Sequence, residues 1–174
     1  MMMKTIPGAI LISVLSIGYA EAQAATQTST MINTVTITNS CTIVAVGFTT
    51  TYDPIVANAT TNQDVTGTVT TLCTIGASPV ITLGQGANSN TGSTDAVPLR
   101  RLTSGGGTPT FLNYSLFSDT GRTVAWGNTA ATAPTAVVAT IAPAITTIYA
   151  RVPFGQTSGK AAVYTDSVIA TVTF

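Results

Sequence analysis

Short runs of alternating apolar and polar residues recur along this 174-residue chain, and the sharpest one reaches its last residue. In the final twelve residues, VYTDSVIATVTF, the even positions Tyr164, Val168, Ala170, Val172 and Phe174 are mostly apolar, whereas the odd positions are mostly Thr and Ser. A period of two is typical of a strand with one buried face. The pattern therefore predicts a half-buried strand at this end of the chain.

Several further runs are apolar or alternating and are separated by turn residues. They are MINTVTIT (31–38), TIVAVGF (42–48), VTGTVTTL (65–72), PVITLG (79–84), FLNYSLFS (111–118), RTVAW (122–126), TAVVATIA (135–142) and ITTIYARV (145–152). Many short strands with regular turn signals favour an all-β fold, and we expect an immunoglobulin-like β-sandwich rather than a small barrel.

Composition narrows the possible chemistry. Six basic and six acidic side chains cancel, and charged residues make up 7% of the chain, so no strong field exists to attract nucleic acid. Histidine is absent and there are two cysteines, which removes the commonest general base and the usual ligands of a zinc site. We therefore expect a protein that is not an enzyme and has no metal, cofactor or small-molecule substrate.

The first residues are typical of a secretory signal peptide. Lys4 precedes a mainly apolar stretch, IPGAILISVLSIGY, which is followed by the small residues AEAQAA. A transmembrane anchor is the alternative, but such a span needs roughly 20 apolar residues, and Glu21 and Gln23 follow at once. We expect a signal peptide over residues 1–24, cleaved after Ala24 or alternatively after Ala22, and hence an exported protein.

Export places the two cysteines in a compartment where disulfides persist. Cys41 and Cys73 are the only pair that the sequence offers, and they do not have the CxxC spacing of a redox site. We therefore expect a structural disulfide between them, which would stabilise the fold by roughly 3–4 kcal/mol.

Five aspartates are the remaining candidates for acid-base chemistry. Four have turn-like neighbours, where Asp side chains commonly bond the local backbone; they are Asp53, Asp64, Asp95 and Asp119. Asp166 instead lies on the apolar face of the last run, where it marks the rim of the sheet or pairs with a nearby arginine. The candidates for this pairing are Arg100, Arg101, Arg122 and Arg151.

Two other features resemble binding motifs but have simpler interpretations. LGQGAN carries Gly84 and Gly86 but lacks the third glycine and the following helix of a nucleotide loop, so we interpret it as a turn. Trp126 and Tyr149 are most simply aromatic residues of the core or its rim. Carbohydrate stacking on Trp126 is the alternative.

The segment after the signal peptide is a second end run. Met31, Val35 and Ile37 share one face, and Ile32 is the only large apolar residue on the other. Two β-forming ends can pair with each other within one molecule. From periodicity alone, this arrangement and pairing between molecules remain equally open.

A resemblance favours pairing between molecules. The order of the two cysteines and of LGQGAN, LRRL, LNYSLFSD, WGN, IYARVPFGQ and VYTDSVIATVTF resembles the spore coat protein U domain family, and within it the Csu-like pilin subunits of archaic chaperone–usher pili. The chain departs from the family at 161–163, where Ala-Ala-Val stands in place of a glycine, and at NTAATAPT, which replaces a Gly-rich turn.

The resemblance implies an incomplete immunoglobulin-like sandwich that lacks its last strand and receives a donor strand in trans. It implies a donor segment at 25–38, with Met31, Val35 and Ile37 as its inward face, and a pilin domain at 39–174. It places Val168, Ala170, Val172 and Phe174 at the border of the acceptor groove. The implied partners are a periplasmic chaperone, an outer-membrane usher and other pilin subunits.

The implied function is a structural pilus subunit that passes through the periplasm to a cell-surface fibre, for attachment and biofilm formation. The main alternative is a self-contained secreted β-sandwich that binds a glycan or coats a surface, with its end strands paired in cis. A hydrolase that uses aspartates is the last alternative.

Overall fold

The structure is a computed structural model that describes residues 24–174. The chain divides into two units, Met1–Thr36 and Ile37–Phe174. Residues 24–40 contain no helix or strand. The predicted signal peptide lies outside the described residues except for Ala24. Within residues 24–174, no helix has the length and apolar character needed to cross a membrane.

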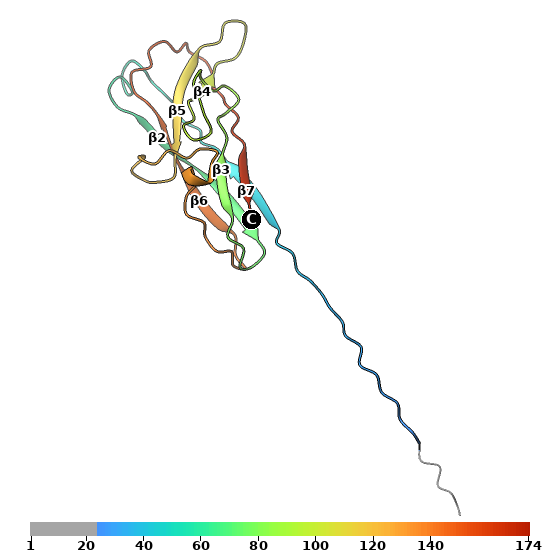
Figure 1. The fold of residues 1–174 in the computed structure, drawn as a ribbon. Helices are drawn as coiled ribbons and strands as arrows, with labels where there is room; N and C mark the ends of the chain where they lie inside the picture. Colours follow the sequence, from blue (N-terminus) through green and yellow to red (C-terminus); the bar gives the residue numbers. More distant parts are fainter. Residues whose placement is uncertain (1–23) are drawn as a thin grey trace, which may run out of the picture. The chain divides into compact units, whose positions relative to one another are not determined.

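The larger unit is built from strands, as Figure 1 shows. In chain order its elements are β1 (Cys41–Val46), β2 (Gln63–Cys73), β3 (Val80–Leu83), β4 (Arg100–Thr103), β5 (Phe111–Phe117), the short 3-10 helix η1 (Ala130–Thr132), β6 (Ala144–Val152) and β7 (Ala170–Thr173). The prediction of an all-β fold is confirmed.

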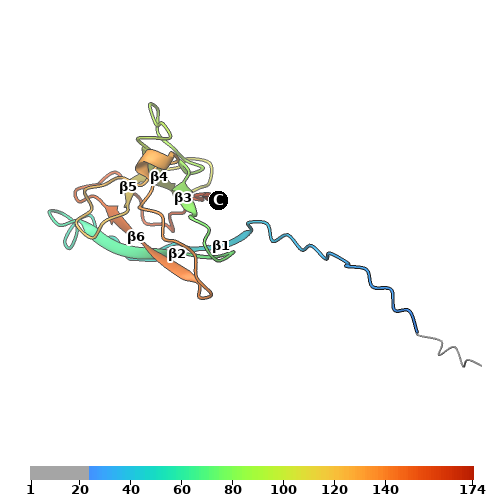
Figure 2. The same cartoon turned by 60° about the horizontal axis from the view of Figure 1, so that its bottom comes forward.

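The strands form two antiparallel sheets. The larger sheet has the order β1-β2-β6-β5-β4, and the smaller one pairs β3 with β7. In Figure 2, β1, β2 and β6 run together as one layer, and β3 lies on the side of the C terminus. Both sheets contribute to one core, because Val69 of β2 and Ile148 of β6 pack with Ile81 and Leu83 of β3. The unit is therefore a β-sandwich, as predicted.

Periodicity located most of the strands. The runs 42–48, 65–72, 79–84, 111–118 and 145–152 each overlap an observed strand. In the final run the even residues from Tyr164 to Val172 are half-buried and the odd residues are exposed, as expected, although only β7 is a regular strand. Phe174 departs from the pattern, because it is 51% exposed.

Three predicted strands do not form. The run 31–38 lies within residues 24–40, which contain no helix or strand. Residues 122–126 contribute only an isolated bridge between Ala125 and Phe117. Residues 135–142 are irregular, because only Ala139 of this run is buried, whereas Val137, Val138 and Ile141 are exposed. A run without a buried face has nothing to hold it in a sheet.

Candidate functional site

A large groove opens over the core of the sandwich. It encloses about 1060 Å³. One wall is residues 45–54, which follow β1 into the next loop, and the other is residues 159–168 together with Ala170. We call this cavity the core groove. Its floor includes core residues from both sheets: Leu83, Leu102, Leu112, Tyr114, Leu116, Ile148 and Val152.

The wall segment that leads into β7 forms backbone hydrogen bonds along one of its two edges. Thr165 exchanges two backbone hydrogen bonds with Thr103, both 2.9 Å. The carbonyls of Ser167 and Ile169 accept from the backbone N–H groups of Ala87 and Gly84 at 3.0 and 2.8 Å. On the wall itself, the residues that form these hydrogen bonds are all odd-numbered: Thr165, Ser167 and Ile169. Because backbone groups of successive residues point to opposite edges of a strand, those of Tyr164, Asp166 and Val168 face the other edge.

The β1 side of the groove also has a backbone edge that is free to pair. β1 pairs with β2 over its whole length. In the part of the chain that the structure describes, β1 has no second strand neighbour and β7 pairs only with β3. β1 and β7 also approach each other. Two strand edges with unpaired N–H and C=O groups therefore border an apolar groove, which is a template for one more strand.

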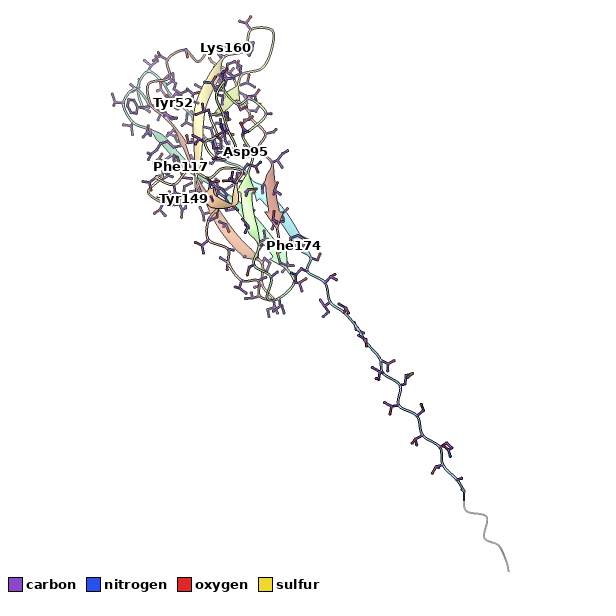
Figure 3. All side chains as sticks on the ribbon, in the orientation of Figure 1. Tyr52, Asp95, Phe117, Tyr149, Lys160 and Phe174 are labelled. Carbon is purple, nitrogen blue, oxygen red and sulfur yellow. A yellow bond between two sulfur atoms is a disulfide. The ribbon has the colours of Figure 1, made fainter. Side chains whose placement is uncertain are left out.

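The four predicted border residues lie along the groove wall and beyond it. Val168 and Ala170 line the core groove. Val172 packs against the core outside the groove lining, and Phe174 is largely exposed. In Figure 3, Tyr52 and Lys160, which line the groove, lie toward one end of the sandwich, and Phe174 lies toward the other.

Sequence reasoning missed part of this site. The groove also takes in Tyr164 and Asp166, which precede the predicted border residues on the same face, and the loop that follows β1. The alternation of the last run carried the signal for Tyr164 and Asp166. No local pattern marks residues 47–54, which are brought to the groove by the path of the chain.

The predicted donor residues belong to the separate N-terminal segment or to its junction. Met31, Val35 and Ile37 are 79%, 90% and 82% exposed, and Ile32 on the other face is exposed as well.

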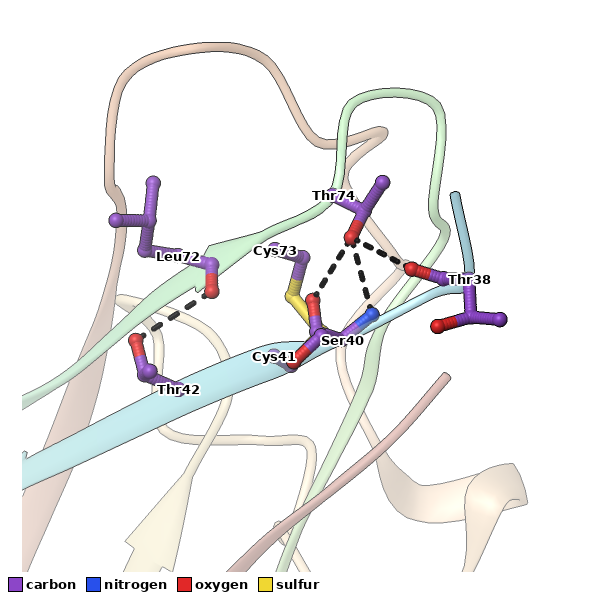
Figure 4. Close-up of a disulfide and its surroundings, with 7 residues drawn as sticks. All are labelled: Thr38, Ser40, Cys41, Thr42, Leu72, Cys73 and Thr74. Carbon is purple, nitrogen blue, oxygen red and sulfur yellow. Dashed lines mark hydrogen bonds between the residues drawn. A yellow bond between two sulfur atoms is a disulfide. The ribbon is translucent and has the colours of Figure 1, made fainter. Parts of the chain in front are cut away.

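The disulfide forms between Cys41 and Cys73, as predicted. The two cysteines face each other at one end of the β1–β2 ladder. Figure 4 shows that the Thr74 hydroxyl accepts from the Ser40 N–H at 3.0 Å and lies 3.3 Å from the carbonyl of Thr38. The start of the domain is thus fixed covalently and by hydrogen bonds to the end of β2.

A buried arginine lies behind the groove floor. Arg100 of β4 donates from Nη2 to the carbonyls of Leu83 and Trp126 at 2.8 and 2.9 Å, and from Nε to the carbonyl of Gly84 at 2.9 Å. Burial lowers the pKa of Arg100 to about 10. Its three bonds tie β4 to β3 and to the segment after β5. β4 is not among the strands that alternation predicts.

Asp166 is the charged residue on the inward, even-numbered face of the last run. Its Oδ2 accepts from the Tyr114 hydroxyl at 2.7 Å, and its Oδ1 accepts from the backbone N–H and the side-chain amide of Asn88 at 3.1 and 3.0 Å. Burial, followed by the bond to Asp166, raises the pKa of Tyr114. The alternative that pairs Asp166 with an arginine is wrong, because Tyr114 and Asn88 donate the hydrogen bonds to its carboxylate.

Gly86 lets the neighbouring loop close over this carboxylate. Its φ is +86°, and a Cβ built on it would lie 2.2 Å from Oδ2 of Asp166. Only glycine combines that backbone conformation with so close an approach. LGQGAN is therefore a turn, as predicted, and it packs against the groove wall.

The other aspartates have structural partners. Asp53 and Asp119 bond the backbone of their own turns, as predicted. Asp64 does not, because it lies in β2 and accepts two hydrogen bonds from Arg151 at 2.7 and 2.8 Å. Asp95 accepts from the side chain of Gln85. Across residues 24–174, no three carboxylate or thiol side chains gather as metal ligands.

Trp126 cannot stack on a carbohydrate, so that alternative is wrong. Its side chain is fully buried, and its Nε1 donates to the carbonyl of Ile81 at 2.9 Å. Tyr149 of β6 is half-buried beneath the guanidinium of Arg122. Both aromatic residues serve the sandwich, as predicted.

Comparisons with known proteins agree with this fold. Residues 26–171 match the family model described as Spore Coat Protein U domain. The chain is 37% identical to Protein U of Myxococcus xanthus over a 178-residue alignment, which covers 98% of each of the two chains.

A solved structure is also similar. It is the CsuC-CsuE chaperone-tip adhesion subunit pre-assembly complex from archaic chaperone-usher Csu pili of Acinetobacter baumannii, with a TM-score of 0.54 and 20% identity. The match covers 80% of this chain and 40% of that one. At this identity the likeness supports the immunoglobulin-like fold.

Proposed function

The chain belongs to the spore coat protein U domain family, and from this premise we propose that it is a structural pilus subunit that polymerises by donor-strand exchange. The observation that carries the proposal is the core groove, an apolar cavity bordered by the free edges of β1 and of the segment that leads into β7. An exposed apolar edge of this kind is an aggregation hazard unless a strand covers it. A dedicated incoming strand resolves the hazard.

The incoming strand is residues 25–38 of another subunit. Main-chain hydrogen bonds to the free edges supply part of the affinity, and alternate side chains that fill the groove supply specificity. Met31, Val35 and Ile37 are the large apolar side chains on one face of this segment, and all three are exposed in the single chain. Val168 and Ala170 line the wall of the groove that receives this segment, and Val172 and Phe174 extend the same edge toward the end of the chain.

The partners follow from this assembly. A periplasmic chaperone covers the groove after export, and an outer-membrane usher exchanges it for the segment of the next subunit. The similar solved structure is a chaperone-tip adhesion subunit complex, which supports this pathway. The finished fibre lies at the cell surface, where it serves attachment and biofilm formation.

The donor face is tested by replacing Val35 and Ile37 with Asp. A buried Val or Ile side chain contributes roughly 1.5–3 kcal/mol, so losing two should weaken strand binding by about two orders of magnitude or more. We expect exported, chaperone-bound subunits but no fibres by electron microscopy. The matched control is T34D/T36D, which adds the same charge to the opposite face and should leave assembly largely intact. Fibres from the V35D/I37D chain would show that the donor assignment is wrong.

The groove is tested by expressing residues 39–174 without a chaperone. Because the groove floor is part of the core, we expect aggregation or degradation. A soluble monomer with a cooperative unfolding transition would contradict the proposal, since its sandwich would then need no strand from outside.

A further inference from the structure

The inward row of the groove wall, Tyr164, Asp166, Val168 and Ala170, contains one carboxylate, and the inward row of the donor segment contains one amide, Asn33. We infer that these two residues, Asn33 of one subunit and Asp166 of the next, form the contact that sets the register of the inserted strand. The inference rests on the proposed donor-strand exchange and goes beyond it, because it names what selects one register among several.

On the donor side, the inward row consists of alternate residues. Met31, Val35 and Ile37 occupy odd positions, and in an extended strand Asn33 lies on the same face between them. All four side chains are exposed in the single chain. A polar amide at the centre of a face that enters an apolar groove needs a polar partner there, because an unpaired buried amide is costly.

On the receiving side, the groove wall provides one such partner. Tyr164, Asp166, Val168 and Ala170 all line the core groove, and Asp166 is the only charged residue among them. Their backbone groups face the free edge. A strand that pairs with this edge therefore places its inward side chains directly beside these four.

The carboxylate of Asp166 has capacity for one more hydrogen bond. Two carboxylate oxygens offer about four acceptor positions, and Asn88 and Tyr114 supply three hydrogen bonds. The amide of Asn33 supplies the fourth. Tyr114, Asn88 and the turn at Gly86 hold the carboxylate in place from within its own domain, so the acceptor is already oriented before the strand arrives.

Alternation alone cannot choose this register. A shift of one residue turns the apolar row outward and is therefore excluded. After a shift of two residues, the same alternate side chains still face into the groove. With antiparallel pairing, as in every strand pair of this domain, Asn33 opposite Asp166 gives one set of neighbours. They are Met31 opposite Val168, Val35 opposite Tyr164 and Ile37 opposite Ala162.

Any shift by two breaks this match. If Val35 lies against the Asp166 carboxylate, Asn33 lies against Val168. If Met31 lies against it, Asn33 lies against Tyr164, whose hydroxyl already bonds Thr110 and the carbonyl of Lys160. Each arrangement buries a polar group without its partner. The polar pair thus discriminates among registers that the apolar residues leave nearly equal in energy.

Disulfide cross-linking between cysteines introduced on the outer face tests the register directly. With Asn33 opposite Asp166, Thr34 lies opposite Thr165, and both side chains are exposed. Directly opposed residues are about 4.5–5.5 Å apart between Cα atoms, which suits a disulfide, whereas a shift of two residues moves them by roughly 7 Å. We expect fibres of the full-length T34C/T165C chain to give a ladder of covalent multimers on non-reducing gels, and those of T34C/S167C and T34C/V163C to give little.

The polar contact is then tested from the donor side, where a change cannot unfold the receiving domain. N33L in the T34C/T165C chain should lower the cross-linked fraction by about tenfold, the value of a hydrogen bond to a charged group. The same change should raise cross-linking in the two shifted pairs. N33D places two carboxylates side by side and should reduce fibre formation, whereas T34D on the outer face should not.

The outcomes separate this inference from the proposed function. Cross-linking through S167C or V163C instead of T165C, equal yields from all three pairs, or yields that N33L leaves unchanged would each overturn the register while leaving donor-strand exchange in place. A chain with the natural sequence that forms no fibres in the same host would overturn both.

Discussion

Replacing Arg100 by Met should destabilise the domain far more than the same change at Arg101, its neighbour in β4. Arg100 is buried, and its guanidinium satisfies three backbone carbonyls, those of Leu83, Gly84 and Trp126. Met keeps most of the apolar volume but supplies no donor, so the loss reports on the hydrogen bonds.

The magnitude follows from the three acceptors. Each buried carbonyl left without a donor costs roughly 1–3 kcal/mol, which sums to roughly 3–6 kcal/mol after partial relaxation. That is a large part of the 5–15 kcal/mol by which ordinary domains are stable. Arg101 donates two longer bonds, 3.1 and 3.2 Å, from a half-buried position and lies over the Phe111 ring. Its loss should cost about 1 kcal/mol.

The measurement needs a chain whose groove is filled within one molecule. A copy of residues 25–38 joined to Phe174 by a flexible linker provides this, because unfolding is then independent of protein concentration. Trp126 is the single tryptophan and is fully buried, so its fluorescence follows the core during urea denaturation. The free energy of unfolding of R100M and R101M is compared with that of the parent chain.

Equal losses for R100M and R101M would refute this reasoning. So would a loss below about 1 kcal/mol for R100M, since it would mean that water or a rearranged loop satisfies the three carbonyls. R100K is a further check, because a lysine ammonium lacks the planar fork and should recover only part of the stability.

Further predictions concern the disulfide and the ion pair on β2. C41S/C73S should lower the free energy of unfolding by roughly 3–4 kcal/mol in urea denaturation, because the bond closes a loop with a sequence separation of 32; an unchanged midpoint would contradict this. The bond from Arg151 lowers the pKa of Asp64. Its contribution is therefore present above the unfolded pKa, near pH 4, and lost as the pH falls through the lower folded pKa. D64N should cost less than about 1 kcal/mol at pH 7 and flatten the fall in stability below pH 4; an unchanged acid limb would argue against the pair.

The strands that the sequence located are those whose alternation reflects a buried face. β2 and β6 are long, and their inward residues Val69, Ile148 and Ala150 are fully or nearly fully buried. The run at 135–142 has a similar apolar content, yet it stays exposed. Apolar content is a local property, whereas burial depends on which segments come to lie over it, and no local pattern contains that information.

β4 illustrates the opposite error. Alternation did not identify this segment as a strand, and its Arg100 is buried because three carbonyls from distant segments accept its hydrogen bonds. One of the two interpretations of Asp166 paired it with an arginine, whereas Tyr114 and Asn88 hold its carboxylate. Partners of buried polar groups come from positions far away in the chain, so they follow from the fold alone.

The sequence by itself determined that the chain is an all-β sandwich, that Cys41 and Cys73 pair, and that alternate residues of the last run face the core. These are consequences of side-chain period and of residue availability, which are properties of single segments. Only the tertiary structure decided where the sheet stays open. The groove lies beside residues 159–168 as well as Ala170, because β3 and Thr103 take one edge of this wall and leave the other edge unpaired. A strand edge becomes free through the pairing of its neighbours, and that pairing is set by the path of the whole chain.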